Sequence, residues 1–167
     1  QAEKFENPNM NFSKQAYLDY TVKSIGLSPA DDVLEVAAGT CACVRSIAPF
    51  VRSVVCLDAT EAMLNVGRRE AANGAVSDMS FVQGLAEDLP CADETCGIAV
   101  SRLAFHHLVE IERPFDEMVH VLKKGAKLVL IDMQAAAEDL RTREDAIETL
   151  RDPSHVCNRS RLELLSL

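Results

Sequence analysis

The chain has 167 residues, of which 48% are hydrophobic, and its formal net charge is −9. This length and composition suffice for one domain with a single hydrophobic core. The negative charge disfavours binding to nucleic acids or to anionic membrane surfaces, because both are themselves negatively charged. The longest apolar runs are the size of strands, far below the roughly 20 residues of a membrane-spanning helix. We therefore expect a soluble protein that spans no membrane.

No basic segment followed by an apolar stretch opens the chain, which favours a cytoplasmic protein over an exported one. The cysteines lack the paired C-x-x-C spacing of zinc sites. The sequence therefore predicts free thiols and no metal site, and the thiols concerned are Cys41, Cys43, Cys56, Cys91, Cys96 and Cys157.

The N-terminal part precedes the predicted sheet and has a helical pattern. Apolar residues at helical spacing predict a helix over residues 13–25, which Gly26 and Ser28-Pro29 would end. The preceding residues 7–11 are polar. We interpret residues 1–28 as a helical extension of the domain.

From residue 33 onward, runs rich in β-branched residues alternate with helical patterns. This alternation is typical of a parallel sheet covered by helices on both faces. The predicted strands cover residues 33–36, 54–58, 79–82, 96–101 and 127–133. Thr60 is expected to cap a helix that runs from Glu61 towards Ala72. Two other apolar stripes have helical spacing and should face the sheet, namely Val44, Ile47, Ala48 and Val51, and Phe115, Met118, Val119 and Leu122.

No strand pattern follows residue 133. Residues 138–151 are charged and helical in pattern, Asp152-Pro153 breaks that pattern, and residues 160–167 predict the beginning of another helix.

Two features at the ends of the first two strands indicate a nucleotide-like ligand. Glu35 lies near the end of the first strand and is followed by small residues up to Gly39, which let backbone amides approach a ligand closely. The second strand ends in Asp58, nineteen positions after Gly39. At that separation a doubly wound sheet brings a carboxylate to the ribose of such a ligand.

Segments 33–41, 56–64 and 84–90 resemble, in order and spacing, successive motifs of the class I S-adenosylmethionine-dependent methyltransferases. Residues 101–108 and 121–128 resemble the fourth motif and the turn before the fifth strand. The likeness covers roughly residues 12–160 and is nearest to the methyltransferases of ubiquinone and menaquinone biosynthesis and their small-molecule homologues.

This resemblance implies an α/β, Rossmann-like, doubly wound and mostly parallel sheet with helices on both faces, in one domain spanning residues 1–167. It implies methyl transfer from S-adenosylmethionine to a small-molecule acceptor by in-line displacement, with S-adenosylhomocysteine as the product.

The resemblance also implies a role for each matching residue. The Gly39 loop lies against the methionine part of the cofactor, Glu35 orients its amino group, and Asp58 binds the ribose. Ala86 offers its backbone amide to the adenine ring. The expected cofactor-binding residues are Glu35, Ala37, Gly39, Asp58, Ala59, Met63, Ala86, Glu87, Ser101 and Arg102. Within this set, Met63 and Glu87 belong to the adenine side, and Met63 has an equally plain interpretation as a core methionine. Ser101 and Arg102 belong to the sulfonium side, where the acceptor enters.

The first motif departs from the family pattern. The usual E/D-x-G-x-G-x-G loop is present as Glu35-x-Ala37-x-Gly39-x-Cys41. Alanine is a mild change if the backbone keeps a negative φ, whereas Cys41 would place a larger side chain where the loop meets the cofactor. Leu85 stands where many relatives carry Asp beside the adenine. We therefore expect weakened cofactor affinity.

The family usually completes a seven-stranded sheet with a C-terminal antiparallel hairpin, and only five strands are predicted here. The expected explanation is a C-terminally incomplete chain, and the second is a partner chain that supplies the missing edge. The strand beginning at Lys127 would then be an exposed sheet edge, which a homo-oligomer could cover.

Two histidines follow the fourth predicted strand. A general base assists methyl transfer when the acceptor is a hydroxyl or an acidic carbon, and His106 or His107 is the candidate by residue type and place. The alternative is that both serve packing and hydrogen bonding. Tyr17 and Tyr20 are candidates to line the acceptor pocket, with ordinary packing against the core as the alternative.

Two rival functions remain open. A nicotinamide-dependent oxidoreductase would also place Gly39 and Asp58 in this way, although its G-x-G-x-x-G turn is absent and Glu35 would lie unfavourably near a pyrophosphate. A non-catalytic protein that binds the cofactor or a partner would account for the altered loop and the missing hairpin.

Overall fold

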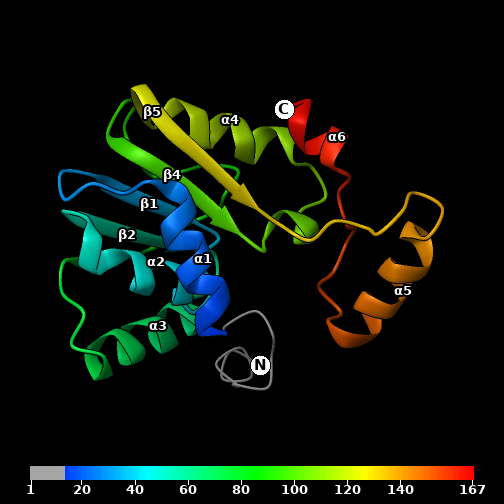
Figure 1. The fold of residues 1–167 in the computed structure, drawn as a ribbon, viewed down its shortest axis with the longest axis horizontal. Coiled ribbons are helices and arrows are strands. Elements are labelled where there is room, and N and C mark those ends of the chain that lie inside the picture. Colours follow the sequence, from blue (N-terminus) through cyan, green and yellow to red (C-terminus); the bar gives the residue numbers. More distant parts are fainter. Residues whose placement is uncertain (1–13) are drawn as a thin grey trace.

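A computed structural model describes residues 14–167, so residues 7–11 and the first residue of the predicted helix 13–25 lie outside the described residues. The described chain forms a five-stranded sheet in the order β3-β2-β1-β4-β5, and every pair of neighbours is parallel (Figure 1). The strands are β1 (Asp32–Val36), β2 (Ser53–Asp58), β3 (Met79–Gln83), β4 (Cys96–Arg102) and β5 (Leu122–Ile131). The doubly wound α/β architecture predicted from the sequence is confirmed.

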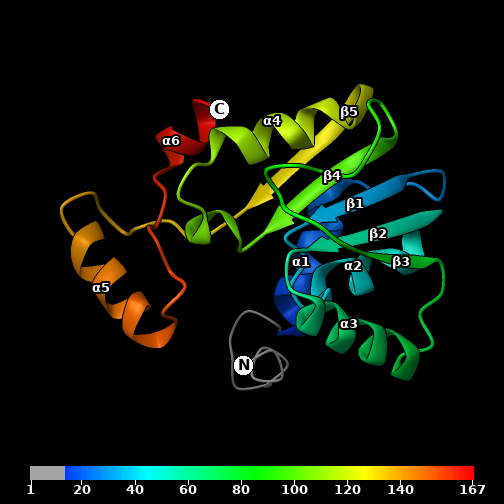
Figure 2. The same cartoon turned by 180° about the vertical axis from the view of Figure 1, so that it is seen from behind.

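Helices connect the strands and cover both faces of the sheet (Figures 1 and 2). Alternate strand residues point to opposite faces of the sheet, so the sheet carries two separate apolar cores. Helices α1, α2 and α3 pack on one core, and α4 packs on the other. The helices are α1 (Gln15–Ile25), α2 (Ala42–Ile47), α3 (Glu61–Asn73), α4 (Glu112–His120), α5 (Arg141–Arg151) and α6 (Arg161–Leu165), with 3₁₀ turns at Ala48–Phe50 and Phe105–His107.

The first four predicted strands agree with the structure to within one residue at each end, but the fifth prediction is wrong at both ends. β5 begins at Leu122, five residues earlier than predicted, because Leu122 already pairs with Cys96 of β4; the register then shifts, and the extra residues, 123–126, lie in β5. It ends at Ile131, because the next residue, Asp132, turns its side chain back onto the loop after β4.

Three helix predictions also need correction. Thr60 occupies the N-cap position of α3, but its side chain makes no capping hydrogen bond. The stripe around Ile47 does not continue as an α-helix, because Pro49 has no N–H to donate and the chain tightens into a 3₁₀ turn. Val119 is 47% exposed, because α4 turns Met118 toward the sheet instead.

The C-terminal part leaves the sheet and returns to it. α5 stands apart from the sheet, whereas α6 lies beside α4 (Figures 1 and 2). Leu164 and Leu167 pack against the core on the α4 face. The stretch between the two helices passes the loop after β4, and Ser160 begins α6 with a capping box to Glu163.

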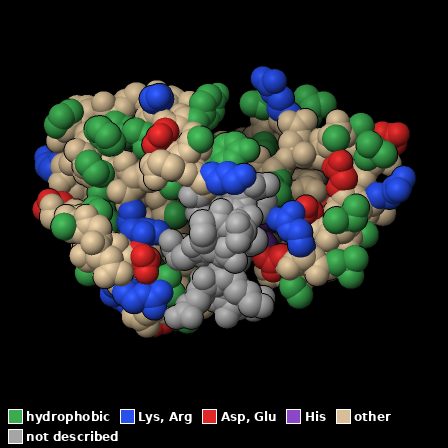
Figure 3. Space-filling model, turned by 60° about the horizontal axis from the view of Figure 1, so that its bottom comes forward, with side chains coloured by type: hydrophobic (Ala, Val, Ile, Leu, Met, Phe, Trp, Pro, Cys, Tyr) green, Lys and Arg blue, Asp and Glu red, His purple; other side chains and the backbone are tan. Residues whose placement is uncertain are grey.

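β5 pairs with β4 and with no other strand of residues 14–167, so its outer edge is unpaired there, as predicted for the fifth strand. None of the described helices has the length and apolar character needed to cross a bilayer. On the face shown in Figure 3, acidic and basic side chains are interspersed.

Candidate active site

The loops that carry the predicted site residues gather at one edge of the sheet. Parallel pairing aligns Glu35 of β1 with Cys56 of β2 and Val100 of β4, so the carboxyl ends of these strands lie together. Ligands of open α/β sheets bind at this edge, where the strand order reverses between β1 and β4. The site therefore begins with the turns that follow β1, β2 and β4.

The Asp58 side chain joins two of these turns. One carboxylate oxygen, Oδ2, accepts a hydrogen bond of 2.7 Å from the Gly39 amide, and Oδ1 accepts one of 2.8 Å from the Thr60 amide. The structure thus brings together Gly39 and Asp58, which were linked in the sequence by their separation of nineteen positions. A carboxylate can accept about four hydrogen bonds, so lone pairs remain for ligand hydroxyls.

The turn after β1 is left-handed at alternate residues. Ala37, Gly39 and Cys41 have φ values of 56°, 55° and 61°. These are the three positions at which the family pattern carries glycine, and left-handed backbone is what glycine adopts without cost. Alanine at position 37 would be a mild change only at a negative φ, and the φ of Ala37 is positive. Each non-glycine residue in left-handed backbone destabilises the fold by about 1–2 kcal/mol.

The side chain of Cys41 is completely buried and packs towards α3. A Cβ atom added at Gly67 of α3 would lie 2.7 Å from the Cys41 sulfur. The prediction that Cys41 crowds the surface where the loop meets the cofactor is therefore wrong, because Gly67 leaves room for the thiol in the core.

Glu35 lies beneath the turn, 2% exposed, and its carboxyl accepts a long hydrogen bond of 3.3 Å from the Val44 amide of α2. Burial raises the pKa of Glu35 to about 8, against a usual 4.5, and the Val44 hydrogen bond and the charge of Arg102 offset this only in part. Its place under the loop agrees with an indirect contact to a ligand.

The turns after β2 and β3 form the neighbouring part of the edge. The Gln83 side chain donates to the Ala59 carbonyl at 3.0 Å, and the Gly84 amide donates to the Asp58 carbonyl at 3.1 Å. Among the residues expected beside adenine, Ala86 is buried, Met63 and Glu87 are half-buried, and Leu85 is 56% exposed. The turns after β2 and β3 are therefore joined directly at residues 58–59 and 83–84.

The end of β4 carries Ser101 and Arg102. Ser101 is 2% exposed and its hydroxyl has no hydrogen-bond partner in the described part of the chain. Arg102 is half-buried and its charge acts on Glu35, which places the guanidinium near the first motif.

The two histidines after β4 have different surroundings. The Nδ1 atom of His106 lies 2.5 Å from Oδ1 of Asp132, and both side chains are nearly inaccessible. His107 donates from Nδ1 to the Ser154 carbonyl at 3.0 Å. Burial and the neighbouring His106 lower the pKa of His107, so its ring is neutral at pH 7. His107 accordingly holds the chain in place, whereas His106 has a carboxylate partner.

Two parts of this region were not predicted from the sequence, namely Asp132 and the closing segment, residues 154–159. The amides of Val156 and Cys157 donate to the His106 carbonyl at 2.9 and 3.1 Å. Arg159 donates to the Leu108 carbonyl at 2.5 Å. An acidic residue directly after a strand was the available signal for Asp132, but the predicted strand ran past it. The closing segment binds mainly through backbone groups, which leave no sequence signal.

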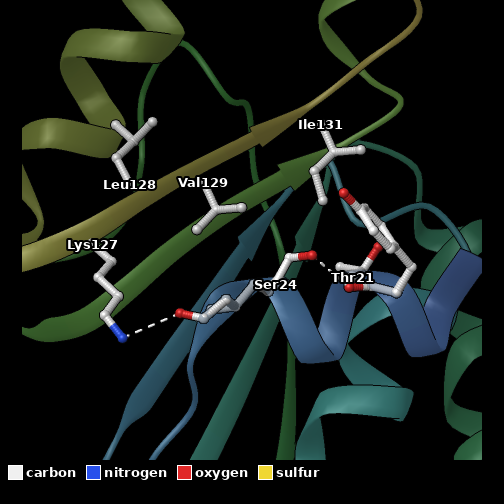
Figure 4. A pocket seen from close by; sticks show the side chains of 8 residues that line it. Thr21, Ser24, Lys127, Leu128, Val129 and Ile131 are labelled. Carbon is white, nitrogen blue, oxygen red and sulfur yellow. Dashed lines mark hydrogen bonds between the residues drawn. The ribbon is translucent and has the colours of Figure 1, made fainter.

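The N-terminal helix forms a separate hollow with β5 (Figure 4). Tyr20 and Ser24 of α1 line a cavity of about 320 Å³ together with Val129 and Ile131 of β5. Tyr17 and Tyr20 are 54% and 73% exposed, so packing against the core does not describe them. The cysteines are free thiols, and residues 14–167 contain no cluster of His, Cys, Asp and Glu suited to a metal ion.

The contact between Cys41 and position 67 can be measured in a double-mutant cycle. Gly67→Ala should destabilise the protein by about 1–3 kcal/mol, because the added methyl group overlaps the Cys41 sulfur. Most of this cost should disappear in a Cys41→Gly background, as measured by urea unfolding. Gly74→Ala is the control, because an added Cβ there meets only ordinary contacts. Equal costs of Gly67→Ala in both backgrounds would contradict the packing argument.

The burial of Glu35 should appear as a pH dependence of stability. Because its folded pKa of about 8 exceeds the usual 4.5, the native state holds a proton that the unfolded state releases, and stability falls as pH rises across this window. Glu35→Gln should remove that loss and gain up to a few kcal/mol over the parent, increasingly from pH 5 to pH 8. Urea unfolding at several pH values tests this, with the exposed Glu110→Gln as control. A pH-independent difference would show that Glu35 is ionised when folded.

Comparisons with known proteins agree with this geometry. Residues 34–130, more than half of the chain, match the family model described as a methyltransferase domain. The chain is 30% identical over 146 residues to the uncharacterized methyltransferase YcgJ of Bacillus subtilis, which covers 87% of this chain and 58% of YcgJ. It is 30% identical over 125 residues to the ubiquinone/menaquinone biosynthesis C-methyltransferase UbiE of Ectopseudomonas mendocina, covering 72% of this chain and 49% of that protein.

Solved structures show the same relationship. The crystal structure of YcgJ matches with a TM-score of 0.84 and 30% identity, over 90% of this chain and 65% of that one. Geranyl diphosphate C-methyltransferase from Streptomyces coelicolor, solved with S-adenosyl-L-homocysteine, matches with a TM-score of 0.77 at 17% identity and shares the fold. The chain spans about half the length of the curated relatives it matches. On the matched motifs and on this fold, the chain belongs to the class I S-adenosylmethionine-dependent methyltransferases.

Proposed function

We propose that this domain binds S-adenosylmethionine at the carboxyl edge of its sheet and that the protein transfers the methyl group to a small-molecule acceptor. The observation that carries the proposal is the Asp58 carboxylate, which is held by the Gly39 and Thr60 amides in the turns that a nucleoside would contact. A fixed carboxylate with spare lone pairs fits a ribose diol, and the small residues of the first turn fit a closely approaching methionine chain.

Each expected residue has a place in this proposal. Asp58 and Ala59 hold the ribose, and the Ala37–Gly39 turn lies against the methionine moiety with Glu35 beneath it. Met63, Ala86 and Glu87 border the adenine, and Ser101 and Arg102 border the sulfonium. The cofactor supplies an activated methyl group, and the protein holds the acceptor atom close to that group and in line with it.

The acceptor is proposed to be a small organic molecule. The net charge of −9 opposes a nucleic-acid substrate, and UbiE relatives are named for quinone biosynthesis. We propose His106 as the general base, and His107 as a packing residue because its Nδ1 holds Ser154. The protein is proposed to act in the cytoplasm, with residues 1–167 as one domain whose residues 1–28 form a helical extension. A second copy covering the outer edge of β5 remains a hypothesis.

One specific observation favours a second candidate, a non-catalytic cofactor-binding protein. Ala37 and Cys41 occupy left-handed positions of the turn where the family pattern carries glycine, so two of its three glycine positions are altered in this chain. A nicotinamide-dependent enzyme fits less well, because the G-x-G-x-x-G turn of dinucleotide-binding folds is absent from the first motif.

Calorimetric titration with S-adenosylhomocysteine tests the proposal. The parent should bind it with micromolar affinity, and Asp58→Ala should weaken binding about 10–100-fold, because ribose hydroxyls lose their acceptor and the Gly39 turn loses its anchor. Asp58→Asn should lie between the two, and Asp116→Asn, an exposed change on α4, should bind as the parent does. Binding of NAD instead would overturn the proposal. Binding without turnover on any acceptor would favour the non-catalytic candidate.

A further inference from the structure

Asp132 is the most completely engaged carboxylate at the carboxyl edge of the sheet. The Asp132 carboxylate accepts three hydrogen bonds. The donors are the His106 ring at 2.5 Å, the His106 backbone amide at 3.1 Å and the amide of the next residue, Met133, at 2.7 Å. Its side chain is 3% exposed and that of His106 is 7% exposed. The carboxylate therefore fixes both the His106 ring and the backbone that carries it.

This contact selects one form of the His106 ring. A carboxylate oxygen accepts, so the proton of the neutral ring is held on Nδ1 and the lone pair is left on Nε2. No hydrogen bond to Nε2 comes from the described residues. The rings of His107 and His155 lie beside it, with centroids at 4.0 and 5.5 Å. An imidazole oriented by a carboxylate, with its second nitrogen unused, has the arrangement of a general base.

Several buried polar atoms of β4 and of residues 155–159 lack a hydrogen-bond partner within the described residues. His155 donates from Nε2 to Asp145 at 2.9 Å, which leaves its buried Nδ1 as a lone pair without a partner. The Asn158 carbonyl oxygen and the Ser101 hydroxyl are likewise buried and unpaired within the described residues. Buried polar atoms without partners are rare. The same set includes two buried donors, the Nε atoms of Arg141 and Arg159, so it matches a molecule that both donates and accepts hydrogen bonds, as a hydroxyl group does.

The closing segment keeps this region away from bulk water. Its amides at Val156 and Cys157 hold the His106 carbonyl, and its Ser154 carbonyl holds His107. Because water is excluded, the electrostatic environment of the His106 ring is set by the fixed protein groups around it and not by solvent.

We propose that Asp132 is a positioning residue that holds His106 as the general base, and that the acceptor is a hydroxyl compound of the phenol class. This rests on the proposed function. In the step, the bond between sulfur and methyl breaks with its electron pair left on sulfur, and a lone pair of the acceptor oxygen forms the new O–CH₃ bond. The hydroxyl proton passes to His106 Nε2, and Asp132 stays a carboxylate. The imidazolium later releases its proton to solvent, so the products are a methyl ether, S-adenosylhomocysteine and one proton.

Histidine side-chain ¹⁵N NMR tests the positioning role without any acceptor. In the parent bound to S-adenosylhomocysteine, the His106 ring should carry its proton on Nδ1 and none on Nε2. The His106 signals are assigned by their absence from the spectrum of His106→Gln. Asp132→Asn should shift the ring toward the Nε2-protonated form, because the amide NH₂ group donates to Nδ1, and a ring nitrogen that accepts a hydrogen bond carries no proton. Asp132→Glu should restore the parental form, and His120→Gln, on the surface of α4, should leave it unchanged. An Nε2-protonated His106 in the parent, or no change in Asp132→Asn, would overturn the proposal.

Turnover on simple catechols tests the substrate class. Asp132→Asn should lower kcat about 10²–10⁴-fold on catechol. The loss should be much smaller on 4-nitrocatechol, which is already ionised at neutral pH and needs no base. A merely structural role of Asp132 would lower both rates equally and would overturn the proposal, as would a parent that binds S-adenosylhomocysteine but methylates no phenol or catechol. Failure of the parent to bind S-adenosylhomocysteine would instead refute the proposed function itself.

Discussion

The hydrogen bond between the Asp58 carboxylate and the Gly39 amide is the constraint on which the site depends. It joins the ends of the central strand β1 and its neighbour β2, and fixes the turn after β1 relative to the turn after β2. The second oxygen of Asp58 holds Thr60 at the start of α3, so helix and turn take their positions from one side chain. Because α3 also packs against Cys41, the turn is held from both sides.

Much of this arrangement could be predicted from the sequence, since it follows from local patterns. The β-branched runs placed the first four strands closely, and parallel pairing of β1 with β2 then determines where Gly39 and Asp58 meet. The same strand predictions located the turn after β2, which carries Ala59, and the end of β4, which carries Ser101. Thr60 was misjudged because its backbone carbonyl, and not its side chain, accepts the hydrogen bond from the Met63 amide in the first turn of α3.

The rest depends on contacts between distant segments. Asp132 meets a ring 26 positions earlier in the chain, and only the premature end of β5 turns it there. The closing segment reaches the loop after β4 through the amides of Val156 and Cys157, which any residue but proline would supply. The left-handed conformations of Ala37 and Cys41 run against the residue types present, so no propensity would have predicted them.

The fit between Cys41 and Gly67 has a consequence for how such loops can change. The two positions compete for one volume, so a larger residue at 67 becomes acceptable only after the thiol is gone. A search for improved variants that restores glycine in the first motif while leaving α3 fixed would open a void beside Gly67. Libraries that vary both positions together would reach combinations, such as glycine at 41 with alanine at 67, that stepwise selection passes over. Residue 41 in the turn after β1 and residue 67 in α3 should therefore change together in evolution, although 26 positions separate them.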